Sequence, residues 1–85
     1  MSDPTNGDRA AWALTAVGSF HGETRYYAFD PFSDGEVLEA AGDLLCNLMH
    51  LIQGYGESAL QAVKDATEMF LEEVAEELQD LEEVD

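Results

Sequence analysis

The sequence predicts a mainly α-helical fold: a small three-helix domain with one short extended aromatic segment and a long acidic C-terminal helix. Apolar residues recur every three or four positions along three stretches of the 85-residue chain, which is the period of a helix packed on one side. Residues that cap helix N-termini precede two of these stretches. The length suits one domain, and a hydrophobic share of 46% is typical of a chain with a folded core.

The first helix is predicted over 9–21, after a flexible polar lead-in over 1–8. Thr5 and Asp8 have the spacing of a capping box, in which each side chain accepts a hydrogen bond from the other's backbone. The following stretch is rich in alanine, the strongest helix former, and Gly22 is placed to end the helix in a left-handed conformation. Apolar residues in the same stretch also alternate as they do in a strand, so a strand stays open as the alternative.

An extended aromatic segment is predicted over 24–32. Aromatic side chains favour extended structure, and Pro31 disfavours helical backbone at the residue before it. A single strand has no sheet to join in so short a chain. Three arrangements therefore stay open: a loop over the core, one half of a hairpin with the preceding stretch, or an edge strand that pairs with a second copy.

The second helix is predicted over 35–53, at the centre of the core. Ser33 and Glu36 have the spacing of a second capping box, and Gly54-Tyr55-Gly56 breaks the chain. The apolar residues cover an arc too broad for one neighbouring helix. Cys46 lies in this apolar run, and as the only cysteine it is expected to be a buried free thiol.

The third helix is predicted over 57–82 and is the longest. Its apolar residues form a nearly regular heptad seam, made of Leu60, Val63, Thr67, Leu71, Val74, Leu78 and Leu81. The other helices are too short to cover all of it, so the far end is available to a partner. The residues predicted for self-association are Leu71, Val74, Leu78 and Leu81, and the sequence allows a homodimer.

Negative charge is the exceptional property of this chain. Nineteen acidic residues face only Arg9, Arg25 and Lys64, which gives a formal net charge of −16. Eleven of the acids fall in 57–85, where like charges four residues apart repel each other and carboxylates oppose the helix macrodipole. The charge excludes binding to nucleic acid and to anionic membranes, because phosphate binding requires Lys and Arg. With no apolar stretch of membrane-spanning length and no signal peptide, a cytoplasmic location is expected.

Three interpretations of the acidic helix stay open. It is a solvated face with a frayed end, a ligand surface for Lys and Arg on a partner, or an adaptation to a high-salt cytoplasm. Regularly spaced carboxylates can imitate a phosphate backbone, so the second interpretation includes a nucleic-acid mimic that occupies a basic site. The candidate partner-binding residues are Glu68, Glu72, Glu73, Glu76, Glu77 and Asp80.

No residue pattern predicts a catalytic or metal site. The Cys and His residues lack zinc-ligand spacing, and the glycines lack the Lys of a phosphate-binding loop. The nearest polar constellation is a stripe of the second helix, made of Glu36, Asp43, Asn47 and His50. His50 there could act as a general base or a metal ligand, but it is expected to be a partly buried histidine at the edge of the core. We therefore predict no enzyme, no cofactor and no metal.

Two stretches, Arg9-Ala10-Ala11-Trp12-Ala13 and Asp43 to His50, resemble small uncharacterised helical proteins encoded by actinobacterial phages. The resemblance covers at most a third of the chain and implies a phage or mobile-element origin without any activity. The predicted function is a non-catalytic acidic binding protein, such as a phage-encoded inhibitor that occupies a basic site on a protein in the host cytoplasm. The alternative is a small structural or assembly protein whose long C-terminal helix pairs with itself.

Overall fold

The computed structural model describes residues 4–83 and contains three helices: α1 (Asn6–Thr24), α2 (Asp34–Gly54) and α3 (Ala59–Glu83). No strand occurs within this range. The prediction of a small three-helix domain is confirmed. The first three residues of the predicted lead-in lie outside the described range.

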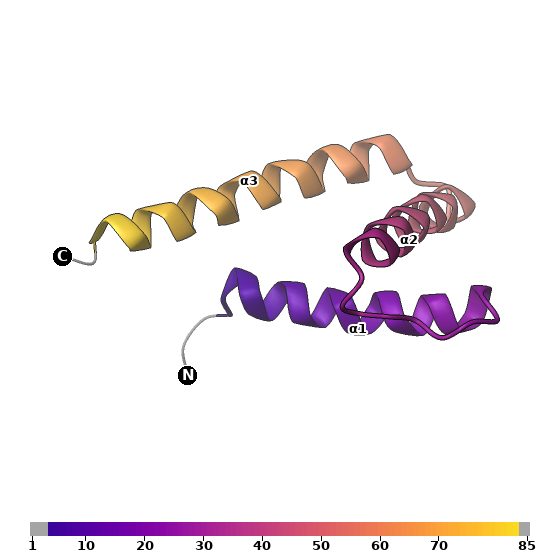
Figure 1. Cartoon of the computed structure of the whole chain (residues 1–85). Coiled ribbons are helices and arrows are strands. Elements are labelled where there is room, and N and C mark those ends of the chain that lie inside the picture. The colour runs from indigo at the N-terminus through magenta and orange to yellow at the C-terminus, as the bar shows by residue number, and fades with distance from the viewer. Residues whose placement is uncertain (1–3, 84–85) are drawn as a thin grey trace.

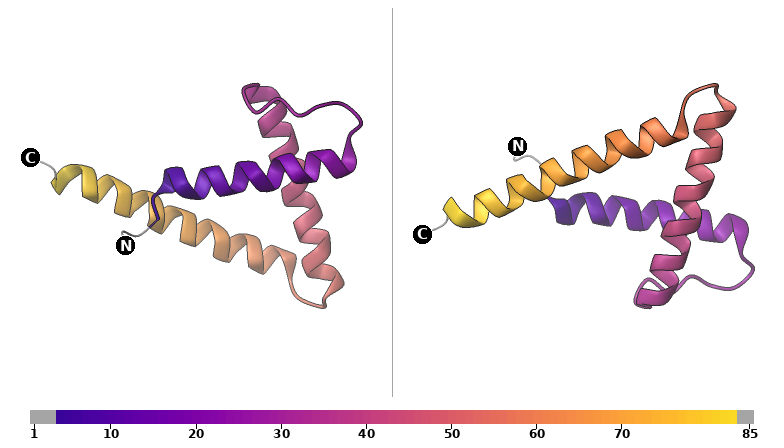
Figure 2. Two further views of the ribbon diagram at one scale, coloured as in Figure 1. Left: turned by 90° about the horizontal axis from the view of Figure 1, so that it is seen from below. Right: turned by 90° about the horizontal axis from the view of Figure 1, so that it is seen from above.

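The three helices form an open arrangement rather than a parallel bundle. α2 runs across both other helices, and α1 and α3 approach each other only where the start of α1 meets the second half of α3 (Figures 1 and 2). The last turns of α3 extend past the start of α1 (Figure 2). The principal extents of the molecule are 49 × 34 × 25 Å.

α1 begins at the predicted capping box. Thr5 N donates to Asp8 Oδ2 at 2.9 Å, and Asp8 N donates to Thr5 Oγ1 at 3.1 Å. The stretch after it is helical, which settles the choice between helix and strand. The prediction that Gly22 ends the helix is wrong, because α1 continues to Thr24 and only Arg25 becomes extended. His21, one residue before this glycine, is buried, so packing offsets the cost of about 1 kcal/mol that glycine imposes inside a helix.

The aromatic segment is a loop over 25–33 that links α1 to α2. The hairpin alternative is wrong, because the preceding stretch that it would pair with lies in the helix α1. The alternative of an edge strand that pairs with a second copy stays a prediction. Within the loop, Tyr27 and Phe29 pack on the His21 ring at centroid distances of 4.9 and 5.2 Å. Tyr26 and Phe32 are 102% and 92% exposed, so only part of the segment covers the helices.

α2 begins after Ser33, whose Oγ accepts a hydrogen bond from Glu36 N at 3.4 Å. The second half of the predicted capping box is wrong, because the Glu36 carboxylate accepts from Asp30 N at 2.9 Å and leaves Ser33 N to bond Asp30 O. The helix ends at Gly54 as the glycine pattern predicts. Gly56 has a φ of 83°, in the left-handed region that favours glycine.

The start of α3 is fastened to the end of α2. Ala59 is buried, and its backbone N–H donates to Gln53 Oε1 at 2.7 Å. Ser58 Oγ accepts from Gln61 N at 3.1 Å, as an N-cap side chain does.

The buried core is very small. Within the described residues the only buried hydrophobic residues are Val17, Ala40 and Ala59, and no large side chain is fully buried. α2 contacts both other helices, as expected of a central helix, yet Leu38 on it is 74% exposed. The prediction of a buried Cys46 is wrong: its thiol is exposed, because the neighbours of α2 cover only part of its broad apolar arc.

Candidate functional site

The six predicted partner-binding acids fall on two neighbouring ridges of α3. Glu68, Glu72, Glu76 and Asp80 are four residues apart and form one ridge along the helix surface. All four are exposed, and we call this set the acidic ridge. Glu73 and Glu77 belong to the next ridge, which faces the start of α1.

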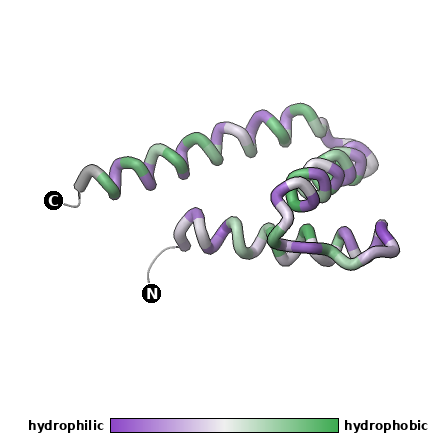
Figure 3. Tube along the Cα trace, in the orientation of Figure 1, coloured by the Kyte–Doolittle hydropathy of each residue, from purple (hydrophilic) through white to green (hydrophobic). Residues whose placement is uncertain are grey.

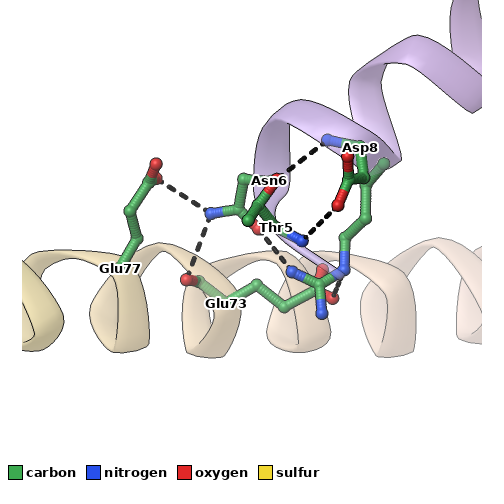
Figure 4. Close-up of polar contacts among 6 residues, drawn as sticks. Thr5, Asn6, Asp8, Glu73 and Glu77 are labelled. Carbon is green, nitrogen blue, oxygen red and sulfur yellow. Dashed lines mark hydrogen bonds and ion pairs between the residues drawn. The ribbon is translucent and has the colours of Figure 1, made fainter. Parts of the chain in front are cut away.

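A polar junction joins α1 to the second of these ridges (Figure 4). Arg9 Nε lies 2.7 Å from a carboxylate oxygen of Glu73. The Asn6 side-chain amide donates to Glu73 O at 3.2 Å and to Glu77 Oε2 at 2.9 Å. Its own oxygen accepts from Arg9 Nη1 at 2.7 Å, so the amide holds the guanidinium in place. Arg9 thus neutralises the charge of Glu73 within the chain. The sequence pattern had predicted Glu73 as one of six acids that bind a partner.

Arg25 lies away from the acidic ridge, whereas Lys64 is four residues before Glu68, at the start of that ridge. Arg25 Nη2 approaches Asp43 at 2.8 Å and Glu39 at 3.8 Å, both on α2. Lys64 forms no ion pair within residues 4–83. Charge is therefore uneven on α3: the ridge facing α1 has an Arg partner, and the acidic ridge has no such partner in the described part of the chain.

A hollow lined by polar groups lies beside this junction, between the start of α1 and the second half of α3. Its volume is about 410 Å³, and Arg9, Glu73, Glu76, Glu77 and Asp80 contribute to its wall. No group of three or more His, Cys, Asp or Glu residues among positions 4–83 is arranged to hold a metal ion.

The polar stripe of α2 does not assemble around His50. Asp43 pairs with Arg25, and the Asn47 amide donates to Asp43 O of its own helix at 2.8 Å. His50 is exposed, so the prediction of a partly buried histidine is wrong for this residue. The reason is that α1 meets α2 near Ala40, nearly three helical turns earlier.

His21, and not His50, is the buried histidine of this chain's described residues. It is 4% exposed and lies beside Glu36, Glu39 and Asp43 in the junction between α1 and α2. Its Nε2 atom has no hydrogen-bond partner in the described structure. The available signal was its spacing of four from Val17 on one helix face, which is the spacing of two core residues.

The apolar seam of α3 is largely uncovered. Leu60, Leu71, Leu78 and Leu81 are 76%, 59%, 57% and 68% exposed, and Val63 and Val74 are half-buried. The Thr67 hydroxyl donates to Val63 O of its own helix at 2.8 Å, so this seam residue offers no free donor. Figure 3 shows hydrophobic and hydrophilic turns alternating along α3, including the turns that extend past α1.

Two grooves flank the middle of this helix, and Phe70 lines both. The groove between α2 and α3 has a volume of about 380 Å³, with Leu45, Leu48 and Ile52 on its α2 side. The groove between α1 and α3 has about 360 Å³ and includes Val74. Phe70 is nevertheless 61% exposed, so the two walls leave much of its ring uncovered.

Among the described helices, none is both long and apolar enough to cross a membrane. No family model, curated protein or solved structure matches this chain. Two surfaces of the described chain are open to a partner: the acidic ridge and the uncovered apolar surface of α2 and α3.

Proposed function

We propose that this chain is a non-catalytic binding protein that offers the acidic ridge of α3 to a basic surface on another protein. The observation that supports the proposal is the separation of charge. Arg9 and Arg25 pair with acids on other surfaces, and Glu68, Glu72, Glu76 and Asp80 stay exposed on one ridge. Lys64 lies beside Glu68 at the start of this ridge, and a basic partner would supply the counter-charge for the other three acids.

The spacing of the ridge suits such a partner. Residues four apart rise by about 6 Å along a helix, so each carboxylate can meet a separate Lys or Arg. Neighbouring like charges cost the helix roughly 0.2–0.5 kcal/mol per pair, and a basic partner would remove this cost. Binding would therefore stabilise α3 as well as hold the partner.

The partner that fits best is a protein whose basic site ordinarily holds nucleic acid, because a row of carboxylates offers the same charge as a row of phosphates. In this proposal the chain is a phage-encoded inhibitor that acts in the host cytoplasm. DNA or RNA added to the complex should then compete with the chain for the partner.

The test compares two variants that lose the same charge. The ridge variant carries Glu68→Gln, Glu72→Gln and Glu76→Gln, and the control carries Glu23→Gln, Asp34→Asn and Glu57→Gln at exposed positions elsewhere. Partners are captured from actinobacterial lysate, identified, purified and titrated by calorimetry at low and high salt. We expect the ridge variant to bind about tenfold more weakly or worse, with a smaller salt dependence, and the control to stay within about twofold.

Equal weakening by both variants would show that overall charge, not the ridge, attracts the partner. If no salt-sensitive partner is captured, the acids are a solvated face or a salt adaptation, and the proposal fails.

A second candidate function is a small assembly protein that pairs with itself. The uncovered seam favours it, since Leu71 and Leu78 are each more than half exposed on a helix of 25 residues. Replacing either leucine by Asp should dissolve the assembly, whereas the ridge variant should leave it intact.

A further inference from the structure

The described chain covers much less of its surface than a self-contained protein of its size. It exposes 7002 Å², whereas a compact monomer of 9.3 kDa exposes about 5,000 Å². Its radius of gyration is 15.5 Å, against roughly 12 Å for a compact 85-residue domain. Roughly 2,000 Å² per chain is therefore left for a partner to cover, which for two chains falls in the range of obligate dimers.

Part of the exposed surface is apolar and lies around Phe70. Leu45 and Leu48 on α2 are 56% and 43% exposed, and with Phe70 they line the same groove. Leu71 and Leu78 extend this surface along α3. We call these five residues the apolar face.

The composition of the groove between α2 and α3 restricts what can fill it. Its wall is apolar except for Thr67, whose hydroxyl is already bonded within α3. A polar or charged occupant would lose its hydration without gaining a hydrogen bond. Phe70, Leu71 and Leu78 are exposed apolar side chains on α3. The chain therefore has both an apolar groove and apolar side chains that could fill the same groove of another copy.

The acidic ridge does not obstruct such a contact. At 100° per residue, Glu72 points roughly 150° away from the middle of the arc between Phe70 and Leu71. Two chains that meet through the apolar face keep their acidic ridges on the outside. The net charge of −16 on each chain still opposes association, and salt screens that repulsion.

We propose that a second copy of this chain covers the apolar face and forms an isologous dimer. Phe70 and Leu71 of each copy insert at the groove between α2 and α3 of the other, as two-fold symmetry requires. The second copy completes the core, which is why no large side chain among the described residues is fully buried within one chain. The dimer does not depend on the acidic ridge, and each chain of the pair keeps that ridge free.

The test measures the mass of the full chain by sedimentation equilibrium over a range of concentration and salt. Phe70→Asp is the disrupting variant, and Trp12→Asp is the control, because Trp12 is 63% exposed on the side of α1 turned away from Val17. We expect a wild-type dimer that tightens as salt rises. Phe70→Asp should weaken it at least about thirtyfold, as removal of an interface hot spot does, and Trp12→Asp should change it less than about threefold.

A spin label on the exposed Cys46 gives a readout that needs no substitution in the apolar face. With one label per chain, a dimer gives a single distance between labels, and that signal should vanish in Phe70→Asp.

A wild-type chain that stays folded and monomeric at molar salt overturns the proposal. A dimer that survives Phe70→Asp but is lost in Trp12→Asp overturns it as well. The ridge variant should keep or tighten the dimer, so failure of the acidic-ligand proposal is distinguishable from failure of this one.

Discussion

The two ends of α1 meet the rest of the chain through different kinds of contact. At the C-terminal end, Val17 and His21 are buried, and Ala40 is buried on the α2 side. At the N-terminal end the bonds to α3 are polar: Arg9 Nε lies 2.7 Å from a carboxylate oxygen of Glu73, beside the open groove that Phe70 lines. One end is packed and the other is bonded at the surface.

This difference indicates where the folding energy of α1 resides. Apolar burial contributes about 25 cal/mol per Å² removed from water, and salt does not weaken it. An ion pair between partly exposed side chains contributes little, and salt weakens it further. We therefore expect the C-terminal end of α1 to stabilise the fold and the N-terminal end mainly to orient α3.

Val17→Asp should have the largest effect. A carboxylate at a position that is only 5% exposed loses most of its hydration, and such a burial costs several kcal/mol. Because the core is so small, we expect the variant to lose its cooperative thermal transition, measured by circular dichroism at 222 nm.

Ala16→Asp is the matched control, because it adds the same charge to the exposed face of α1 one residue earlier. Its free energy of unfolding should fall by about 0.5 kcal/mol, which is the difference in helix propensity between Ala and Asp. If both variants melt alike, added charge rather than burial decides stability, and the packed end of α1 is not the anchor.

Arg9→Ala and Arg25→Ala compare the ion pairs at the two ends of α1. The Arg9 and Glu73 side chains are 35% and 27% exposed, and Arg9 also donates to Asn6, whereas Arg25 and Asp43 are 40% and 45% exposed. We expect Arg9→Ala to lower the free energy of unfolding by about 1 kcal/mol and Arg25→Ala by less than about 0.5 kcal/mol. Urea unfolding at fixed protein concentration measures both.

High salt sharpens this comparison. The loss from Arg9→Ala should shrink by half or more at about 1 M salt, where the screening length falls to about 3 Å. A loss that is unchanged by salt would mean that the Arg9 side chain acts through packing in the groove beside Phe70, and the N-terminal end would then resemble the C-terminal one.

The helices were predictable because local signals mark them. Capping residues, glycines and a period of 3.6 determine where a helix can start, stop and bury a face, and all three helices follow. The sequence left the aromatic segment open between a loop and a strand, since residue preferences for extended structure do not reveal whether a second strand exists. The prediction that Gly22 ends α1 failed for a related reason: the local sequence pattern does not show that His21 is buried against other parts of the chain.

A site was predictable from the sequence only where all of its residues lie on one helix. The acidic ridge and the seam each lie on α3, so periodicity alone finds their residues. The pairing of Arg9 with Glu73 joins residues 64 positions apart and depends on how α1 meets α3. Cys46 and His50 were placed in the core because the sequence shows how apolar α2 is, but not how much of it the neighbours cover.

Gly22→Ala and Gly7→Ala should each raise stability by a small amount, and the two gains compare how firmly the backbone is held at the two ends of α1. A Cβ at Gly22 meets no atom within 4 Å, and one at Gly7 meets Thr5 Oγ1 at an ordinary 3.5 Å, so neither change is opposed by a clash. Alanine restricts the unfolded chain and stabilises a helical position by about 0.4–1 kcal/mol. Gly22 lies beside the packed end and should gain most of that amount, whereas Gly7 lies in a first turn held by polar bonds and should gain less.

Gly56→Ala is the reference in the opposite direction, because its φ of 83° strains any L side chain and should lower stability. Thermal melts of the three variants give the order directly, and a larger gain at Gly7 than at Gly22 would show that the N-terminal end of α1 is the more firmly held of the two.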